Sequence, residues 1–200
     1  IAASSVEKSF TVTNPADGSI VAKVPDLGAP ETEKAIALAN DAQVAWAGLT
    51  AGERGAILRR WHDLILASEK ELGEILTLEQ GKPLAEARRE VTFNASYIEW
   101  FAEEAKRAYG DVIPTSASSR RQLVIKQPVG IVGAITPWNF PSGMITRKAA
   151  PALAAGCTIV IKPASATPLS ALAIAQLCEM AGIPAGVVNV VTGSAREIGT

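Results

Sequence analysis

Short apolar segments alternate with helical segments over the last third of the chain, and this order limits the folds open to it. The apolar segments are 130–136, 158–162 and 187–191, and their near-continuous apolar character is typical of strands buried on both faces. Helical patterns follow them in turn, at 141–155, at 168–181 and from Ser194. This order predicts an α/β fold: an open, doubly wound parallel sheet with helices on its faces.

The first half of the chain has a different pattern. Residues 9–25 alternate loosely and contain an Asp17-Gly18 pair, which predicts a β-hairpin that turns at this pair. Helical periodicity then predicts four helices: about 30–46, one announced by Thr50, one from Ser68 to Gly81 and one from Pro83 to Gly110. Thr50 with Glu53, and Ser68 with Glu71, have the spacing of capping boxes, in which each side chain satisfies a free backbone N–H.

The composition excludes several classes of function. The chain has 200 residues, 48% of them hydrophobic, which is enough for a sizeable core. Its 19 basic and 20 acidic residues nearly balance, which argues against a nucleic-acid footprint or a polybasic membrane patch. No apolar run reaches the roughly 18 residues that a membrane helix needs. The first residue is Ile1 and not Met, so a removed targeting segment stays open.

Metal and nucleophile chemistry have few candidates. Cys157 and Cys178 lack the spacing of a metal site or a disulfide framework, and both lie in apolar contexts typical of core thiols. They favour a reducing compartment, and we expect a cytoplasmic protein. The single histidine, His62, lies outside the apolar stripe of its helix, and we expect a solvated surface side chain. Zinc chemistry and a Ser-His-Asp triad are therefore disfavoured, and no metal is expected.

Polar or glycine residues follow each predicted strand. Ligands of open parallel sheets bind beyond the carboxyl ends of the strands, which here lead to Asn139, Lys162, Ser165, Gly193 and Ser194. A helix start after Gly193 would favour an anion, so the set suits a phosphorylated cofactor. Each residue alone also fits an ordinary role, as a turn residue, a solvated strand end or a turn glycine. The pattern leaves both interpretations open, and no Gly-x-Gly-x-x-Gly fingerprint follows any strand.

Longer motifs carry a resemblance to a known family. They are LEQGKP at 78–83, ITPWNFP at 135–141, AGC at 155–157 and PAGVVNVVTG at 184–193. The chain resembles the aldehyde dehydrogenase superfamily over essentially its whole length, with the motifs in the family's order. MITRK at 144–148 and KPAS at 162–165 resemble its NADP-linked succinate-semialdehyde branch. The resemblance implies that a cysteine thiolate attacks the aldehyde, that hydride passes to the nicotinamide, and that a glutamate-activated water releases the acid.

The resemblance also implies roles for particular residues. Asn139 would be the oxyanion donor to the tetrahedral intermediate. NADP, with NAD as the weaker alternative, would contact Thr136, Trp138, Asn139, Lys162, Pro163, Ala164, Ser165, Gly193 and Ser194. Among these, Lys162 and Ser165 would hold the adenosine ribose and its phosphate, and Arg147 would face the substrate's far carboxylate. The implied reaction is oxidation of succinate semialdehyde to succinate with reduction of NADP, by way of a thiohemiacetal and a thioester.

The resemblance divides the chain and sets limits to it. It implies an amino-terminal hairpin and helical part at 1–110, the start of an oligomerisation hairpin at 111–129 with a strand at 121–127, and a nucleotide-binding core at 130–200. The family's cysteine nucleophile and base glutamate lie after Thr200, so we expect the chain alone to be inactive and the full-length enzyme to be a homodimer or homotetramer. Two alternatives stay open: a glutarate-semialdehyde dehydrogenase, and a truncated, non-catalytic nucleotide-binding or assembly module.

Overall fold

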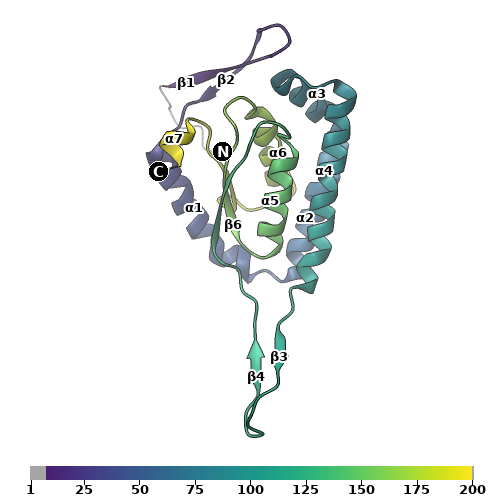
Figure 1. The fold of residues 1–200 in the computed structure, drawn as a ribbon, viewed down its shortest axis with the longest axis vertical. Helices are drawn as coiled ribbons and strands as arrows, with labels where there is room; N and C mark the ends of the chain where they lie inside the picture. Colours follow the sequence, from purple (N-terminus) through teal and green to yellow (C-terminus); the bar gives the residue numbers. More distant parts are fainter. Residues whose placement is uncertain (1–7, 200) are drawn as a thin grey trace.

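A parallel sheet lies at the centre of the fold. The computed structural model describes residues 8–199 and places β6 (Thr158–Lys162) inside the body of the molecule (Figure 1). β6 pairs with β5 (Ile131–Ile135) on one side and with β7 (Val188–Val190) on the other. Both pairs are parallel, in registers that set Ile135 beside Lys162 and Ile161 beside Val190. Helix α5 (Gly143–Ala154) connects β5 to β6, and α6 (Leu169–Met180) connects β6 to β7. The predicted α/β fold with a parallel sheet is confirmed.

Helices cover both faces of this sheet. On one face, Ile159 and Ile161 of β6 share a core with α5, α6 and α2 (Ala51–Ala67). On the other face, Ala35 and Ala39 of α1 (Ala29–Gly48) pack with Val160. All five residues of β6 are buried, which explains why this segment is almost continuously apolar.

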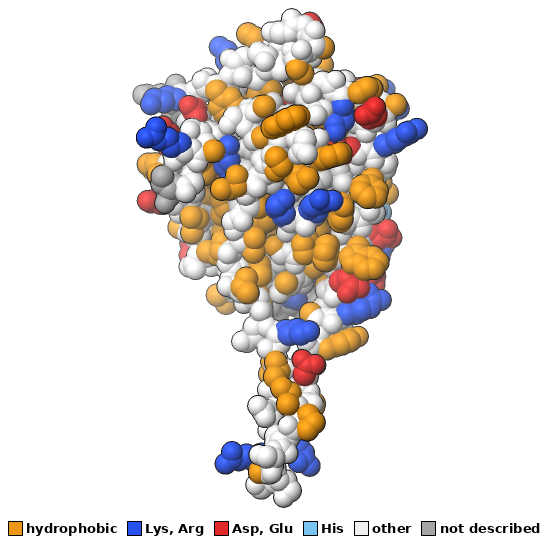
Figure 2. All heavy atoms as spheres, viewed as in Figure 1, with side chains coloured by type: hydrophobic (Ala, Val, Ile, Leu, Met, Phe, Trp, Pro, Cys, Tyr) orange, Lys and Arg blue, Asp and Glu red, His pale blue; other side chains and the backbone are white. Residues whose placement is uncertain are grey.

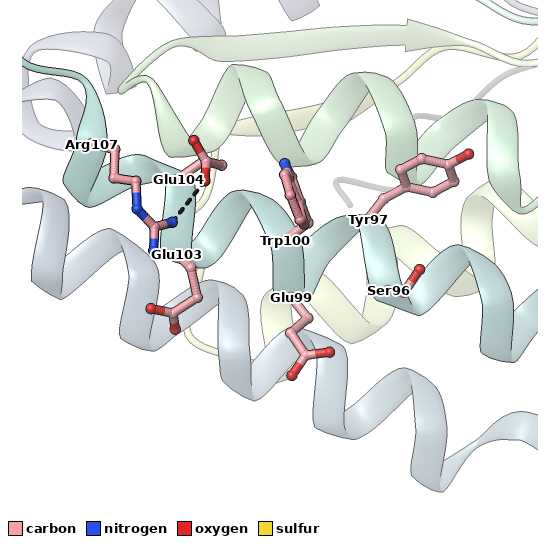
Figure 3. Close-up of a pocket in the computed structure, with 7 residues that line it drawn as sticks. All are labelled: Ser96, Tyr97, Glu99, Trp100, Glu103, Glu104 and Arg107. Atoms are coloured by element: carbon pink, nitrogen blue, oxygen red, sulfur yellow. Dashed lines mark hydrogen bonds and ion pairs between the residues drawn. The ribbon is translucent and has the colours of Figure 1, made fainter.

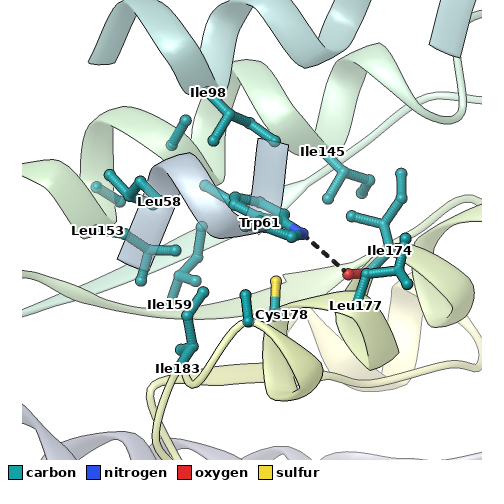
Figure 4. Packing of buried hydrophobic residues seen from close by; sticks show 14 of the residues in the cluster. Leu58, Trp61, Ile98, Ile145, Leu153, Ile159, Ile174, Leu177, Cys178 and Ile183 are labelled. Carbon is teal, nitrogen blue, oxygen red and sulfur yellow. Dashed lines mark hydrogen bonds between the residues drawn. The ribbon is translucent and has the colours of Figure 1, made fainter. Parts of the chain in front are cut away.

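Trp61 of α2 lies in the middle of the larger core (Figure 4). Its side chain is fully buried, and its Nε1–H donates to the Ile174 carbonyl of α6 at 3.3 Å, which satisfies a donor that would be costly to bury alone. The prediction that the neighbouring His62 is solvated is wrong, since its side chain is only 12% exposed. The reason is that α2 packs against α4 (Leu84–Glu104) as well as against α5 and α6.

The amino-terminal elements follow the predicted order. β1 (Ser9–Thr13) and β2 (Ile20–Pro25) pair antiparallel, and Gly18 takes the left-handed backbone that the turn requires, with φ 74°. The predicted capping box at Thr50 and Glu53 is present at the start of α2.

The second predicted capping box is wrong. Ser68 makes no side-chain hydrogen bond at the start of α3 (Glu69–Gln80). It also ends α2, and its backbone, at φ −100° and ψ 16°, lacks the extended conformation that an N-cap residue needs. After α3, α4 runs to Glu104 and continues as a short 3-10 turn, Ala105–Arg107, before Gly110.

A two-stranded arm projects from the body between α4 and β5 (Figure 1). β3 (Asp111–Ile113) pairs antiparallel with β4 (Gln122–Val124), and every residue of both strands is exposed. The strand predicted over 121–127 is therefore shorter than expected, because only its part opposite β3 has a partner. Apolar side chains lie on the surface of this arm (Figure 2). Among its residues, Val112 is 71% exposed and Leu123 is 68% exposed.

A buried glutamate caps the start of α6. Glu79, in the last turn of α3, is only 3% exposed and accepts backbone N–H bonds from Leu169 and Ser170, at 2.6 and 2.8 Å. Free N–H groups at a helix start need such acceptors. Burial raises the pKa of Glu79 to about 7, because removing the carboxylate from water outweighs the hydrogen bonds, which lower it.

We expect this proton to make stability depend on pH. Because the folded pKa of about 7 lies above the ordinary 4.5, the stabilisation from the proton is complete below 4.5 and is lost as pH rises through about 7. The loss is on the order of 3 kcal/mol, at about 1.4 kcal/mol per pKa unit. Glu79→Gln cannot ionise and should remove this slope, measured as the free energy of unfolding in denaturant from about pH 5 to about pH 8. Equal slopes in both proteins would contradict the expectation.

Candidate active site

The predicted strand-end residues meet at one edge of the sheet. Ser165, in the loop after β6, donates its hydroxyl to the Gly193 carbonyl at 2.9 Å, and the Lys162 ammonium lies 3.4 Å from the Ser165 Oγ. Thr136, directly after β5, is buried and donates its backbone N–H to the Lys162 carbonyl at 3.0 Å. The segments after β5, β6 and β7 are therefore joined by hydrogen bonds, as expected at the carboxyl ends of parallel strands.

Lys162 is the notable charge at this edge. Lys162 is only 5% exposed, and burial lowers the pKa of its ammonium group. No carboxylate of residues 8–199 pairs with it, although lysine is rarely buried without a partner. Pro163 beside it is buried and Ala164 is half-buried. A buried ammonium next to a hydroxyl can bind an anion that reaches this edge.

Gly193 lies where two backbone segments touch. Its φ is 145°, and a Cβ at this position would collide with the backbone of Leu27. The Leu27 N–H donates to the Thr192 carbonyl at 2.8 Å, which holds the two segments together. Ser194 then starts α7 (Ala195–Ile198) and accepts from the Arg196 N–H at 3.3 Å. In this structure, the backbone that approaches Gly193 closely is therefore that of Leu27.

A cavity of about 550 Å³ lies between α4 and the start of α5. Its walls include Asn139 and Arg147, the two residues predicted to act on the aldehyde and on its far carboxylate. Lys82, Arg89 and Met144 also line it. Trp138 does not line this cavity and is 59% exposed. The cavity brings the candidate oxyanion donor and a candidate carboxylate-binding cation into one space.

Arg147 is held against an aromatic side chain. Its guanidinium carbon lies 4.9 Å from the centre of the Tyr97 ring, and the group donates to the Tyr97 hydroxyl. Phe93 packs edge-on against Tyr97 with the ring centres 5.8 Å apart. Both aromatic residues belong to α4, so this helix fixes the direction of the guanidinium. An ordinary freely solvated helix arginine would have no such platform.

The loop that carries Asn139 is anchored from α4. Glu90 is only 7% exposed, and its Oε1 accepts backbone N–H bonds from Ser142 and Gly143 at 3.0 and 3.4 Å. Its Oε2 pairs with Lys82, whose Nζ also lies 3.3 Å from the Asn139 carbonyl oxygen. The Asn139 side chain is exposed and makes no hydrogen bond with any residue in 8–199. The backbone of Asn139 is held while its side-chain amide stays available.

Several cavity residues come from α4 and the turn before it, and their role is not predicted from the sequence. Lys82, Arg89, Glu90 and Tyr97 all line or support it. One signal could have found Glu90: it lies three residues after Ala87 and next to Val91, on the stripe of α4 that faces inward. A charged residue on a buried stripe requires a specific partner.

A second hollow, of about 610 Å³, lies along the outer side of α4 (Figure 3). Trp100 and several acidic side chains line it, and Glu104 pairs with Arg107 at one end, at 2.7 Å. None of the predicted site residues lies in it.

Both cysteines are buried, as predicted. Cys157 precedes β6 and is 3% exposed, and Cys178 lies in α6 and is 2% exposed. Burial raises the pKa of Cys178, which favours its unreactive thiol form.

Residues 8–199 hold no group of three or more His, Cys, Asp or Glu side chains placed to bind a metal ion. None of the helices in the same range combines the length and the apolarity of a membrane span.

The whole chain matches one protein family: residues 1–200 fit the model of the aldehyde dehydrogenase family. The chain is 60% identical over 192 residues to the mitochondrial succinate-semialdehyde dehydrogenase of Arabidopsis thaliana, covering 96% of this chain and 36% of the relative. It is 59% identical over 192 residues to the glutarate-semialdehyde dehydrogenase of Pseudomonas putida, covering 96% of this chain and 40% of the relative. A crystal structure of an E. coli NADP-dependent enzyme superposes with a TM-score of 0.95 at 59% identity, covering 96% of this chain and 40% of that one.

The fold, the residues at the carboxyl edge of the sheet and the family match over the whole chain all indicate the same class of protein. The chain belongs to the aldehyde dehydrogenase family, and its α/β fold is the fold of that family's solved members. It spans 36% of the length of the Arabidopsis relative and 40% of the length of the Pseudomonas relative. The cytoplasmic location and the three-part division of the chain stay predictions, and one relative is named as mitochondrial.

Proposed function

We propose that the whole protein oxidises succinate semialdehyde to succinate and reduces NADP. The observation that carries this proposal is the cavity with Asn139 and Arg147 on its walls. A short acid semialdehyde has an aldehyde at one end and a carboxylate at the other, so it needs a hydrogen-bond donor and a cation in one space. The name of the Arabidopsis relative supports the same substrate.

Asn139 contributes the donor in this proposal. When a thiolate attacks the aldehyde carbon, negative charge grows on the carbonyl oxygen, and the free side-chain amide of Asn139 donates to it. The thiolate and the base belong to segments that the family resemblance places outside these 200 residues. Arg147 binds the far carboxylate with two parallel N–H hydrogen bonds. A substrate held at this end places its aldehyde near Asn139 only if its chain has the matching length.

The sheet edge fits a phosphorylated dinucleotide. Lys162 offers a buried ammonium and Ser165 a hydroxyl, and residues 162–167 carry no carboxylate that would repel a 2′-phosphate. Thr136, Trp138, Pro163, Ala164, Gly193 and Ser194 complete the proposed cofactor contacts. When bound, NADP supplies the acceptor for the hydride that leaves the substrate. The NADP-dependent E. coli enzyme, which has the same fold, supports this choice over NAD.

Glutarate semialdehyde is the second candidate substrate. The Pseudomonas putida relative is named for it, and the aldehyde is one methylene longer with the same terminal carboxylate. A methylene in a binding pocket is worth only about 1–3 kcal/mol, so Arg147 would hold either acid. The ratio of the two kcat/KM values, measured on the full-length enzyme, decides between them.

Replacing Arg147 tests the proposed function. We expect Arg147→Ala in the full-length enzyme to lower kcat/KM for succinate semialdehyde by about tenfold to a hundredfold, because a charge-assisted hydrogen bond is worth about 1.5–3 kcal/mol. Butanal lacks the carboxylate, so its oxidation should change little. Initial rates of NADPH formation with each aldehyde give the comparison.

Arg89→Ala is the matched control for this substitution. Arg89 lines the same cavity but has no aromatic ring beneath its guanidinium in the described part of the chain. If both arginine variants lost the same factor, the net charge of the cavity, and not the position of Arg147, would select the acid. If Arg147→Ala lowered the rates on both aldehydes equally, the residue would be structural and the substrate assignment would fail.

A further inference from the structure

An ion pair holds the Asn139 loop at both ends. At the far end of the loop, Glu90 accepts the first free N–H groups of α5, from Ser142 and Gly143. At the near end, Lys82 contacts the Asn139 carbonyl at 3.3 Å and lies 4.6 Å from the centre of the Phe140 ring. The two charged side chains also pair with each other. Four contacts within residues 139–143, on Asn139, Phe140, Ser142 and Gly143, therefore depend on one pair of charges.

The pair is unusual because it is buried. The side chain of Lys82 is 12% exposed and that of Glu90 is 4% exposed. Burying two opposite charges costs desolvation that their attraction alone often fails to recover, so such a pair is poor evidence for added stability. What sets the pair apart is where it lies. Glu90 belongs to the helix α4, and through the pair this helix is connected to a loop that has no regular secondary structure.

We infer that the Lys82–Glu90 pair positions the oxyanion donor: it fixes the backbone of Asn139, so that the free side-chain amide points at the place where the substrate's oxygen becomes negative. Lys82 and Glu90 are positioning residues, acting through Asn139. The inference rests on the proposed function, because it takes Asn139 as the oxyanion donor. A misplacement of about 1 Å in such a group can cost on the order of a hundredfold in rate.

Two variants in the full-length enzyme cut the pair at different atoms. Glu90→Gln keeps an oxygen for the two α5 N–H groups but sets an NH₂ group against Lys82. Lys82→Met leaves the Glu90 cap in place and removes the contacts with Asn139 and Phe140. Glu79→Gln is the matched control, because it makes the same chemical change at a buried glutamate that caps α6 and makes no hydrogen bond with the loop. Glu79 also repels Glu90, so this variant shows what a change of charge near the pair does by itself.

We expect Glu90→Gln and Lys82→Met to lower kcat by about tenfold or more, by the same factor for succinate semialdehyde and butanal. The two aldehydes share the oxyanion, whereas a carboxylate-binding residue would affect only the first. Lys82→Arg keeps a cation and should recover most of the activity. Glu79→Gln should stay within about twofold of the parent enzyme.

A mutant cycle with Asn139 separates positioning from a general structural role. If Lys82 acts through Asn139, Lys82→Met should cost less than about twofold in an enzyme that already carries Asn139→Ala. The inference is overturned if the full cost persists in that background, or if Glu79→Gln loses as much kcat as Glu90→Gln. The single variant Asn139→Ala separates the positioning role of Lys82 and Glu90 from the proposed function itself. If Asn139→Ala retained the kcat of the parent enzyme, Asn139 would not be the oxyanion donor, and the proposed function would be wrong on this point.

Discussion

Asn139→Ala in the full-length enzyme should lower kcat by about a hundredfold to a thousandfold. The side-chain amide of Asn139 lies on the cavity wall and makes no hydrogen bond with any residue in 8–199, while the Asn139 backbone carbonyl is held by Lys82. A donor that is already in place stabilises the developing oxyanion without reorganising, and losing one typically costs about 2.7–4 kcal/mol. The loss should appear in kcat, with KM for the aldehyde changing little, because the neutral carbonyl binds the donor weakly.

Single-turnover rates and steady-state rates together measure this effect. Asn139→Asp keeps the size of the side chain but replaces the donor with an anion, so it should be at least as impaired as Asn139→Ala. Asn189→Ala is a control, since Asn189 of β7 donates to the Gly186 carbonyl at 2.6 Å and does not line the cavity. An Asn139→Ala enzyme that lost only affinity for the aldehyde, with kcat intact, would show that Asn139 binds substrate and does not stabilise charge.

The strands and the strand-end residues could be predicted because local patterns determine them. An apolar run such as 158–162 has only one stable place in an α/β fold, between two covered faces. Once the strands are parallel, their carboxyl ends must share an edge, so Lys162, Ser165 and Gly193 come together although up to 31 residues separate them. No contact needs to be known in advance for this prediction.

The contribution of α4 could not be predicted, because it depends on how two helices pack across the chain. Tyr97 supports Arg147 from 50 positions away, and Glu90 caps α5 from 52 positions away. Helical periodicity shows which face of α4 is apolar, but it does not show which partner that face meets. The same limit explains the error at His62, where packing of α2 on several neighbours covers a position that lies outside its own apolar stripe.

Ser165→Glu should reverse the cofactor preference of the full-length enzyme. The Lys162 ammonium lies 3.4 Å from the Ser165 Oγ, so a carboxylate at this position would pair with Lys162 and neutralise the only buried cation of the sheet edge within residues 8–199. The same carboxylate would repel a 2′-phosphate and could accept from a ribose 2′-hydroxyl. Losing one charge-assisted hydrogen bond is worth about 1.5–3 kcal/mol, so kcat/KM for NADP should fall by about tenfold to a hundredfold.

The ratio of kcat/KM for NADP to that for NAD measures the change directly, and kcat at saturating NAD should be largely retained. Ala166→Glu is the matched control: it adds the same charge to the next, exposed residue of the loop, one position farther from the strand end. If Lys162 and Ser165 recognise the 2′-phosphate together, only the substitution at Ser165 should shift the ratio strongly. Equal shifts in both variants would mean that the loop senses charge in general. If the parent enzyme used NADP and NAD equally well, the NADP assignment itself would be wrong, because Lys162 and Ser165 would then not distinguish a 2′-phosphate from a 2′-hydroxyl.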